Sequence, residues 1–194
     1  MNDFIFYFKI GLFHVLDLKG YDHILFLVVL AVIYQLKQWK KVLWLITLFT
    51  IGHTITLTLA TYRVLNVKSD LVEFLIPLTI FITGLVNILT FKKIAVKRKK
   101  SPNLFFALFF GLIHGLGFSN YFRIIIDKSN DKLIHLSEFA LGIEAAQTII
   151  VLSILLIGSS LQVLTGVSKR DWVMVTSSVV IGFSLQMIFN RIFW

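Results

Sequence analysis

The feature that most constrains this chain is a series of continuous apolar stretches, most of them about 20 residues long, separated by short polar loops. A helix of about 20 apolar residues matches the hydrocarbon thickness of a membrane, whereas a β-barrel uses alternating segments of about ten residues. Hydrophobic residues make up 57% of the 194 residues, and two residues are proline. The sequence therefore predicts an all-α, polytopic helical membrane protein that forms a single domain over residues 1–194.

The apolar stretches predict six transmembrane helices and one shorter segment. The six are expected at about 21–36, 42–62, 71–91, 103–126, 133–164 and 172–194. The shorter segment, 4–18, contains Lys9 and His14, so we expect a short N-terminal helix that is partly inserted or re-entrant. The chain has no cysteine, and a metal site would therefore use nitrogen and oxygen donors.

The distribution of basic residues predicts how the chain is oriented. The loops after the first, third and fifth expected spans carry eleven lysines and arginines, against five in the alternate loops. Because loops rich in lysine and arginine stay in the cytoplasm, the basic segment 92–100 is expected on that side of a bacterial inner membrane. The net charge of +9 is explained by these loops. The expected surroundings are therefore the lipid bilayer, and no nucleic-acid partner is expected.

Several polar side chains interrupt the apolar stretches at similar depth. Asp22 and His23 stand at the outer end of the first expected span, His53 in the outer half of the second, and His114 near the middle of the fourth. Glu144 lies about ten residues into the fifth, which enters from the outside. Ionisable side chains inside a membrane are costly and are functional by default. These four spans are therefore expected to bring their polar groups together toward the outer side.

The residue types in this group indicate a divalent metal site. Neutral imidazole is the commonest metal ligand, and carboxylates complete nitrogen and oxygen sites for zinc, nickel, cobalt or iron. The expected ligands are His14, Asp22, His23, His53, His114 and Glu144. Supporting hydrogen bonds are expected from Gln147, Thr54 and Asn87. Thr54 has the alternative of bonding back to its own helix, and Asn87 that of joining two helices.

Four motifs, in order along the chain, resemble the HupE/UreJ family of membrane proteins associated with hydrogenase and urease maturation. They are His14 with residues 20–26 (GYDHILF), residues 52–57 (GHTITL), residues 110–118 (FGLIHGLGF) and residues 142–147 (GIEAAQ). The resemblance implies transport of nickel, or cobalt, across the cytoplasmic membrane, with the histidine, aspartate and glutamate positions forming the path. Val15 follows His14 where the nickel-permease branch has proline, so the chain looks closer to a second branch of the family.

Two classes of function use the same residues. A permease would bind the hydrated ion at the outer cluster and pass it inward. An intramembrane zinc hydrolase or peptidase would hold zinc with three histidines, and Glu144 or Asp22 would act as general base toward a lipid or membrane-anchored substrate. Sparse polar residues in the inner halves of the helices favour the enzyme, whereas the family resemblance favours the permease, which is our first hypothesis. A homo-oligomer or an accessory subunit is compatible with either function.

Overall fold

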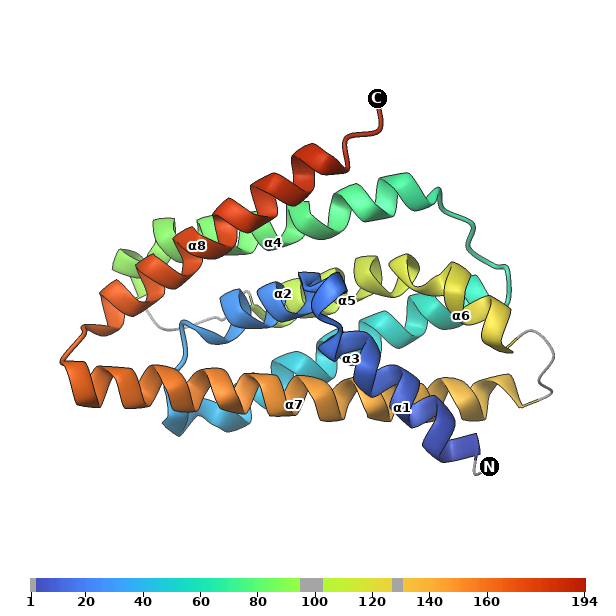
Figure 1. Cartoon of the computed structure of the whole chain (residues 1–194), viewed down its shortest axis with the longest axis horizontal. Coiled ribbons are helices and arrows are strands. Elements are labelled where there is room, and N and C mark those ends of the chain that lie inside the picture. Colours follow the sequence, from blue (N-terminus) through green and yellow to red (C-terminus); the bar gives the residue numbers. More distant parts are fainter. Residues whose placement is uncertain (1–2, 95–102, 127–130) are drawn as a thin grey trace.

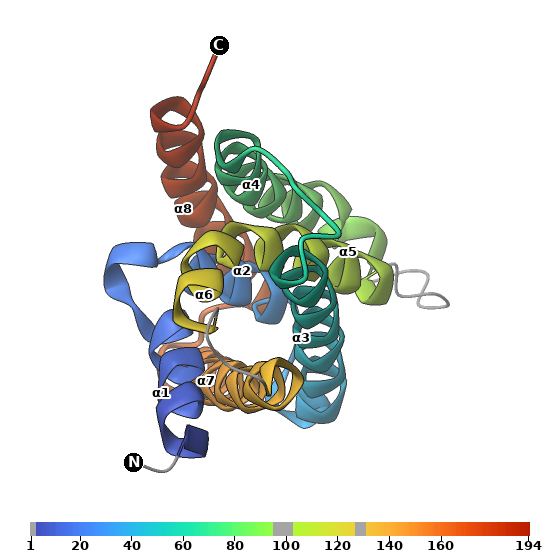
Figure 2. The same cartoon turned by 90° about the vertical axis from the view of Figure 1, so that its right-hand side faces the viewer.

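The computed structural model describes residues 3–94, 103–126 and 131–194, and within these ranges its regular structure is entirely helical. The helices are α1 (Asp3–Leu16), α2 (Asp22–Ala31), α3 (Trp39–Thr61), α4 (Ser69–Ile94), α5 (Asn103–Gly117), α6 (Ser119–Ile126), α7 (Lys132–Thr165) and α8 (Lys169–Asn190), with short 3-10 turns η1 (Leu18–Gly20) and η2 (Leu36–Gln38). They form three layers: α4 and α8 on one side, α2, α5 and α6 in the middle, and α1, α3 and α7 on the other (Figures 1 and 2). The all-α prediction is confirmed.

Four stretches of helix are long and apolar enough to cross a membrane. They are Leu36–Thr61, Ser69–Thr90, Lys132–Thr165 and Lys169–Asn190, and the bent pair of α5 and α6 makes a fifth if it counts as one span. A polytopic helical membrane protein is therefore confirmed among the described residues, with four to five candidate spans. By the length and composition of the described helices, fewer spans are found than the six that were predicted.

The first expected span, 21–36, is shorter than predicted. α2 has ten residues, which is about 15 Å of helix and half of the hydrocarbon core. The helix ends at Ala31, and the backbone is extended at Gln35, where a reciprocal cap starts the next helical segment. In this cap the side chain of Gln38 accepts the Gln35 backbone N–H over 3.2 Å.

The fourth expected span, 103–126, is also broken. α5 ends at Gly117, α6 begins at Ser119, and the two helices meet at 57°. Gly115 and Gly117 lower the helix propensity of this turn. The Ser119 hydroxyl donates to the Leu116 carbonyl oxygen over 2.7 Å, which gives the last turn of α5 a local partner. The break leaves His114 one turn before the end of α5.

Glycines set how closely α3 and α5 approach. A methyl group added to Gly52 would collide with the backbone of Leu108, and one added to Gly111 would collide with the backbone of Phe49. Small residues at such crossings let two helix backbones touch. The contact continues at Gly115, which lies against the backbone of His53. This crossing therefore places His53 of α3 and His114 of α5 on adjoining turns.

A second pair of glycines sets how closely the N-terminal helix α1 packs against α7. A methyl group on Gly11 of α1 would meet the Phe139 carbonyl of α7, and one on Gly142 of α7 would meet the Phe8 carbonyl of α1. α1 thus lies along α7, as Figures 1 and 2 both show.

On the opposite side of the bundle, Asn87 of α4 donates to the Val29 carbonyl of α2 over 2.7 Å and lies 3.4 Å from the Ser177 hydroxyl of α8. Asn87 therefore joins three helices.

Candidate metal centre

Two helix breaks bring four imidazoles together. His14 is in the last turn of α1, and His23 is the second residue of α2, on the other side of the η1 turn. Their ring centroids are 4.6 Å apart. His53 approaches from α3, with its ring centroid 6.0 Å from that of His14, and His114 approaches from α5, 5.3 Å from that of His23. We call these four residues the histidine cluster, and it confirms that the predicted histidines converge.

Three members of the histidine cluster are spaced to share one ion. His14, His23 and His53 each offer a ring nitrogen, and these three nitrogens all lie within 4.8 Å of one another. Two nitrogens bound to the same tetrahedral zinc are about 3.3 Å apart, given metal–nitrogen bonds of about 2.0 Å. Small rotations of the imidazoles would therefore bring the three nitrogens to the spacing found around a shared divalent metal.

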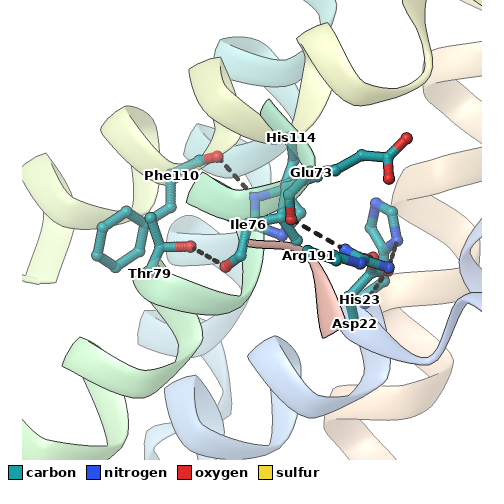
Figure 3. Close-up of polar contacts among 8 residues, drawn as sticks. All are labelled: Asp22, His23, Glu73, Ile76, Thr79, Phe110, His114 and Arg191. Atoms are coloured by element: carbon teal, nitrogen blue, oxygen red, sulfur yellow. Dashed lines mark hydrogen bonds and ion pairs between the residues drawn. The ribbon is translucent and has the colours of Figure 1, made fainter. Parts of the chain in front are cut away.

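Hydrogen bonds at Nδ1 hold the imidazoles of His23 and His114 in place (Figure 3). Nδ1 of His23 lies 3.0 Å from Asp22 Oδ1, and Nδ1 of His114 lies 2.9 Å from the Phe110 carbonyl oxygen. Both oxygens are acceptors, so Nδ1 carries the hydrogen and Nε2 carries the lone pair. Metal-binding histidines are held in this way, by a carboxylate or carbonyl oxygen at the other ring nitrogen.

Five ring nitrogens of the histidine cluster have no partner among the described residues. They are Nε2 of His14, His23 and His114 and both ring nitrogens of His53, all of them buried. Leaving polar atoms buried without hydrogen bonds is costly. Five such atoms in one place form a set of nitrogen donors, and neutral imidazole nitrogens are of the kind that suits a divalent transition metal.

Phenylalanines surround the histidine cluster. Phe118 lies 3.9 Å from His14, Phe49 lies 5.1 Å from His114, and Phe139 lies 6.3 Å from His53, measured between ring centroids. Such an apolar shell keeps water away and strengthens interactions between the ligands and an ion.

Asp22 is placed to orient His23. Its Oδ1 accepts the backbone N–H of His23 over 2.9 Å as well as the ring nitrogen. Its Oδ2 lies 3.7 Å from Nη1 of Arg191, which also donates to the Glu73 carbonyl oxygen over 3.2 Å (Figure 3). Sequence reasoning did not identify Arg191. The only signal was a single base at the end of the last apolar stretch, where an interfacial anchor is the ordinary interpretation.

We expect Asp22→Ala to weaken metal binding by about 10–100-fold, the usual effect of removing a group that orients a ligand. Asp22→Asn keeps an acceptor oxygen but loses the charge, so its affinity should fall between those of the wild type and Asp22→Ala. Isothermal titration of the purified protein with nickel or zinc measures both. Wild-type affinity in Asp22→Ala would contradict the orienting role.

Glu144 belongs to a different polar group, formed by α3 and α7. Its Oε1 accepts the Thr47 hydroxyl over 2.6 Å, and its Oε2 lies 2.5 Å from the Thr50 hydroxyl. Thr50 also lies 3.1 Å from Oε1 of Gln147. We call these four residues the glutamate group. Thr50 precedes His53 by three residues, so the glutamate group lies about 5 Å further along α3, toward its Lys40 and Lys41 end. Its role as a metal ligand stays a prediction.

The remaining polar residues have local partners. Thr54 donates to the Thr50 carbonyl oxygen over 2.8 Å, which is the alternative expected for it. His135, the fifth histidine, lies 3.0 Å from Glu138 Oε2 and stacks on Tyr7 at 4.0 Å between ring centroids. It lies apart from the three histidines that can share an ion.

The fold and the site together define a polytopic helical membrane protein with a buried imidazole site at the breaks of two helices. The chain belongs to the HupE/UreJ family, because the family model described as HupE / UreJ protein matches residues 1–191. No curated protein and no solved structure matches the chain. The family predicted from the four motifs is thus confirmed, while its branch stays a prediction.

Proposed function

We propose that the protein is a divalent metal-ion permease of a bacterial cytoplasmic membrane, and that nickel or cobalt passes through the histidine cluster. The observation that carries this proposal is the meeting of four imidazoles from four helices, with buried ring nitrogens that have no partner among the described residues. Membership of the HupE/UreJ family supports a role related to nickel or cobalt transport. The metal ion is the cargo and also the only small-molecule partner proposed.

The broken helices favour transport. α2 starts, and α5 ends, beside the histidine cluster, so backbone groups of both helices are free of helical partners there. Discontinuous helices at mid-membrane are typical of transporter binding sites. In this arrangement α2 is a half-span that completes the expected six spans. The end of α2 and the starts of α3 and α8 lie at one end of the bundle (Figure 1). We assign this end to the cytoplasm because it carries Lys37, Lys40, Lys41, Lys169 and Arg170.

The zinc-hydrolase alternative shares the imidazoles and the Asp22–His23 pair, which also occurs in zinc enzymes. It further requires a general base within hydrogen-bond reach of a metal-bound water. Both carboxylates already have partners: Glu144 contacts Thr47 and Thr50, and Asp22 contacts His23 and Arg191. The permease is therefore the better supported function.

Uptake by proteoliposomes tests the proposal. Vesicles containing the wild-type protein should accumulate nickel or cobalt in a saturable manner, at least tenfold faster than protein-free vesicles. The purified protein should lose its metal to a chelator within minutes, because a transport site must release its ion. Near-stoichiometric zinc that survives chelation, together with no uptake of either metal, would overturn the permease and favour the enzyme.

A further inference from the structure

A second feature lies at the other end of α2 from the histidine cluster. It is a partly open cavity of about 260 Å³, which we call the inner pocket. Its wall is formed by the end of α2 and the following turn, by η2, by α7 and by Trp172 of α8. Its lining includes Lys37, Leu155, Gly158 and Ser159. The helix segments that line it lie at the end of the bundle that carries the basic loops (Figure 1).

One face of α7 joins the glutamate group to the inner pocket. Gln147, Val151, Leu155 and Gly158 follow one another at intervals of four, four and three residues, which places them on the same side of the helix. All four are buried, and α7 packs against both α2 and α3. The distance from Gln147 to Leu155 is eight residues, or about 12 Å of helix.

Polar groups occupy this face at its outer part and again at the inner pocket, which Gln162 lines. Glu144 and Thr50 supply oxygen atoms next to Gln147, whose Nε2 is buried without a partner among the described residues. Beyond Gln147 the face is closed by Val151, which is 0% exposed. Beyond Val151 it opens again, since Leu155, Gly158 and the half-buried Ser159 line the inner pocket. The histidine cluster, the glutamate group and the inner pocket thus follow one another through the bundle.

We propose that the inner pocket is the cytoplasmic mouth of the metal path, that the glutamate group is the station between it and the histidine cluster, and that Val151 closes the path in this conformation. This inference rests on the proposed permease function. The path would give the ion an inner route, because a carboxylate and hydroxyl oxygens can coordinate a divalent ion after it leaves the imidazoles. Lys37 is exposed at the rim, where water and salt screen its charge.

The natural absence of cysteine makes the pocket directly testable. Ser159→Cys places one thiol in the inner pocket, and Leu156→Cys places one nearby on α7, on an exposed face (52%) outside the pocket. In inside-out vesicles, a charged thiol reagent that cannot cross membranes should modify Ser159→Cys at least tenfold faster than Leu156→Cys. Equal rates, or no reaction of Ser159→Cys, would overturn the assignment of the pocket as a mouth open to the cytoplasm.

Blocking the pocket tests its place in the path. Modification of Ser159→Cys with a bulky reagent should lower nickel uptake by proteoliposomes at least tenfold, while nickel affinity of the same protein in detergent stays unchanged. Uptake at the unmodified rate would overturn the inference, and would fit a pocket that binds only lipid. Failure of the permease function itself is distinguishable, because the unmodified protein would then show no uptake.

Val151 is tested by the same chemistry. The thiol of Val151→Cys should be unreactive in resting vesicles because the position is buried. During nickel uptake its modification should become at least tenfold faster, since the path must open for the ion to leave. The same slow rate with and without nickel would show that Val151 does not close the path.

Discussion

Replacing His53 by alanine is expected to lower metal affinity by more than about 100-fold and to abolish uptake. His53 is fully buried, neither of its ring nitrogens has a partner among the described residues, and it belongs to the three histidines that can share one ion. Removing a group that merely orients a ligand costs about 10–100-fold in affinity, so loss of a ligand should cost more. Titration calorimetry with nickel, together with uptake by proteoliposomes, measures both effects.

His135→Ala is the matched control. His135 is also buried and also lies on a long apolar helix, but it pairs with Glu138 and stacks on Tyr7. The nickel affinity and the nickel uptake of His135→Ala should stay within about twofold of the wild type. His114→Ala should lose affinity, because the Nε2 of His114 is buried beside His23 without a partner among the described residues. Equal losses in His53→Ala and His135→Ala would mean that the effect is structural, and normal binding by His53→Ala would remove the histidine cluster as the metal site.

Gly111→Val is expected to destabilise the fold and the site together. A side chain at Gly111 meets the backbone of Phe49, which cannot rotate away as a side chain would, so α3 and α5 must separate. Overpacking of this kind costs about 3 kcal/mol. At about 2–4 °C per kcal/mol for a chain of this length, the melting temperature should fall by about 6–12 °C. Thermal unfolding in detergent measures this change, and metal affinity should fall with it because His53 and His114 move apart.

Gly182→Ala provides the control for this substitution. Gly182 is inside α8, and an added methyl group meets nothing within 4 Å. Alanine favours helix over glycine by up to about 1 kcal/mol, so the melting temperature should be unchanged or slightly raised. A loss at Gly182 equal to that at Gly111 would contradict the steric argument for the α3–α5 crossing.

Much of the architecture follows from the sequence because a membrane imposes simple lengths. Apolar stretches of about 20 residues can only be helices there, and the depth of a residue follows from its distance to the polar ends. For this reason the all-α fold and the convergence of His23, His53 and His114 were predictable, whereas the family was predictable from the four motifs. The glycines next to His53 and His114 indicated the close crossing of their helices for the same reason, since only small residues allow such contact.

Depth does not determine which way a side chain faces, and here only the tertiary structure decides. Each residue turns a helix by about 100°, so groups at equal depth can face different neighbours. Glu144 was expected with the imidazoles, yet it meets Thr47 and Thr50, and Asp22 meets Arg191 from the far end of the chain. The early end of α2 at Ala31 and the 57° bend after Gly117 both fall inside long apolar stretches, where hydropathy alone gives no sign of a break. The sequence therefore determined the helices and the chemistry of the site, while packing between helices decided which polar groups meet.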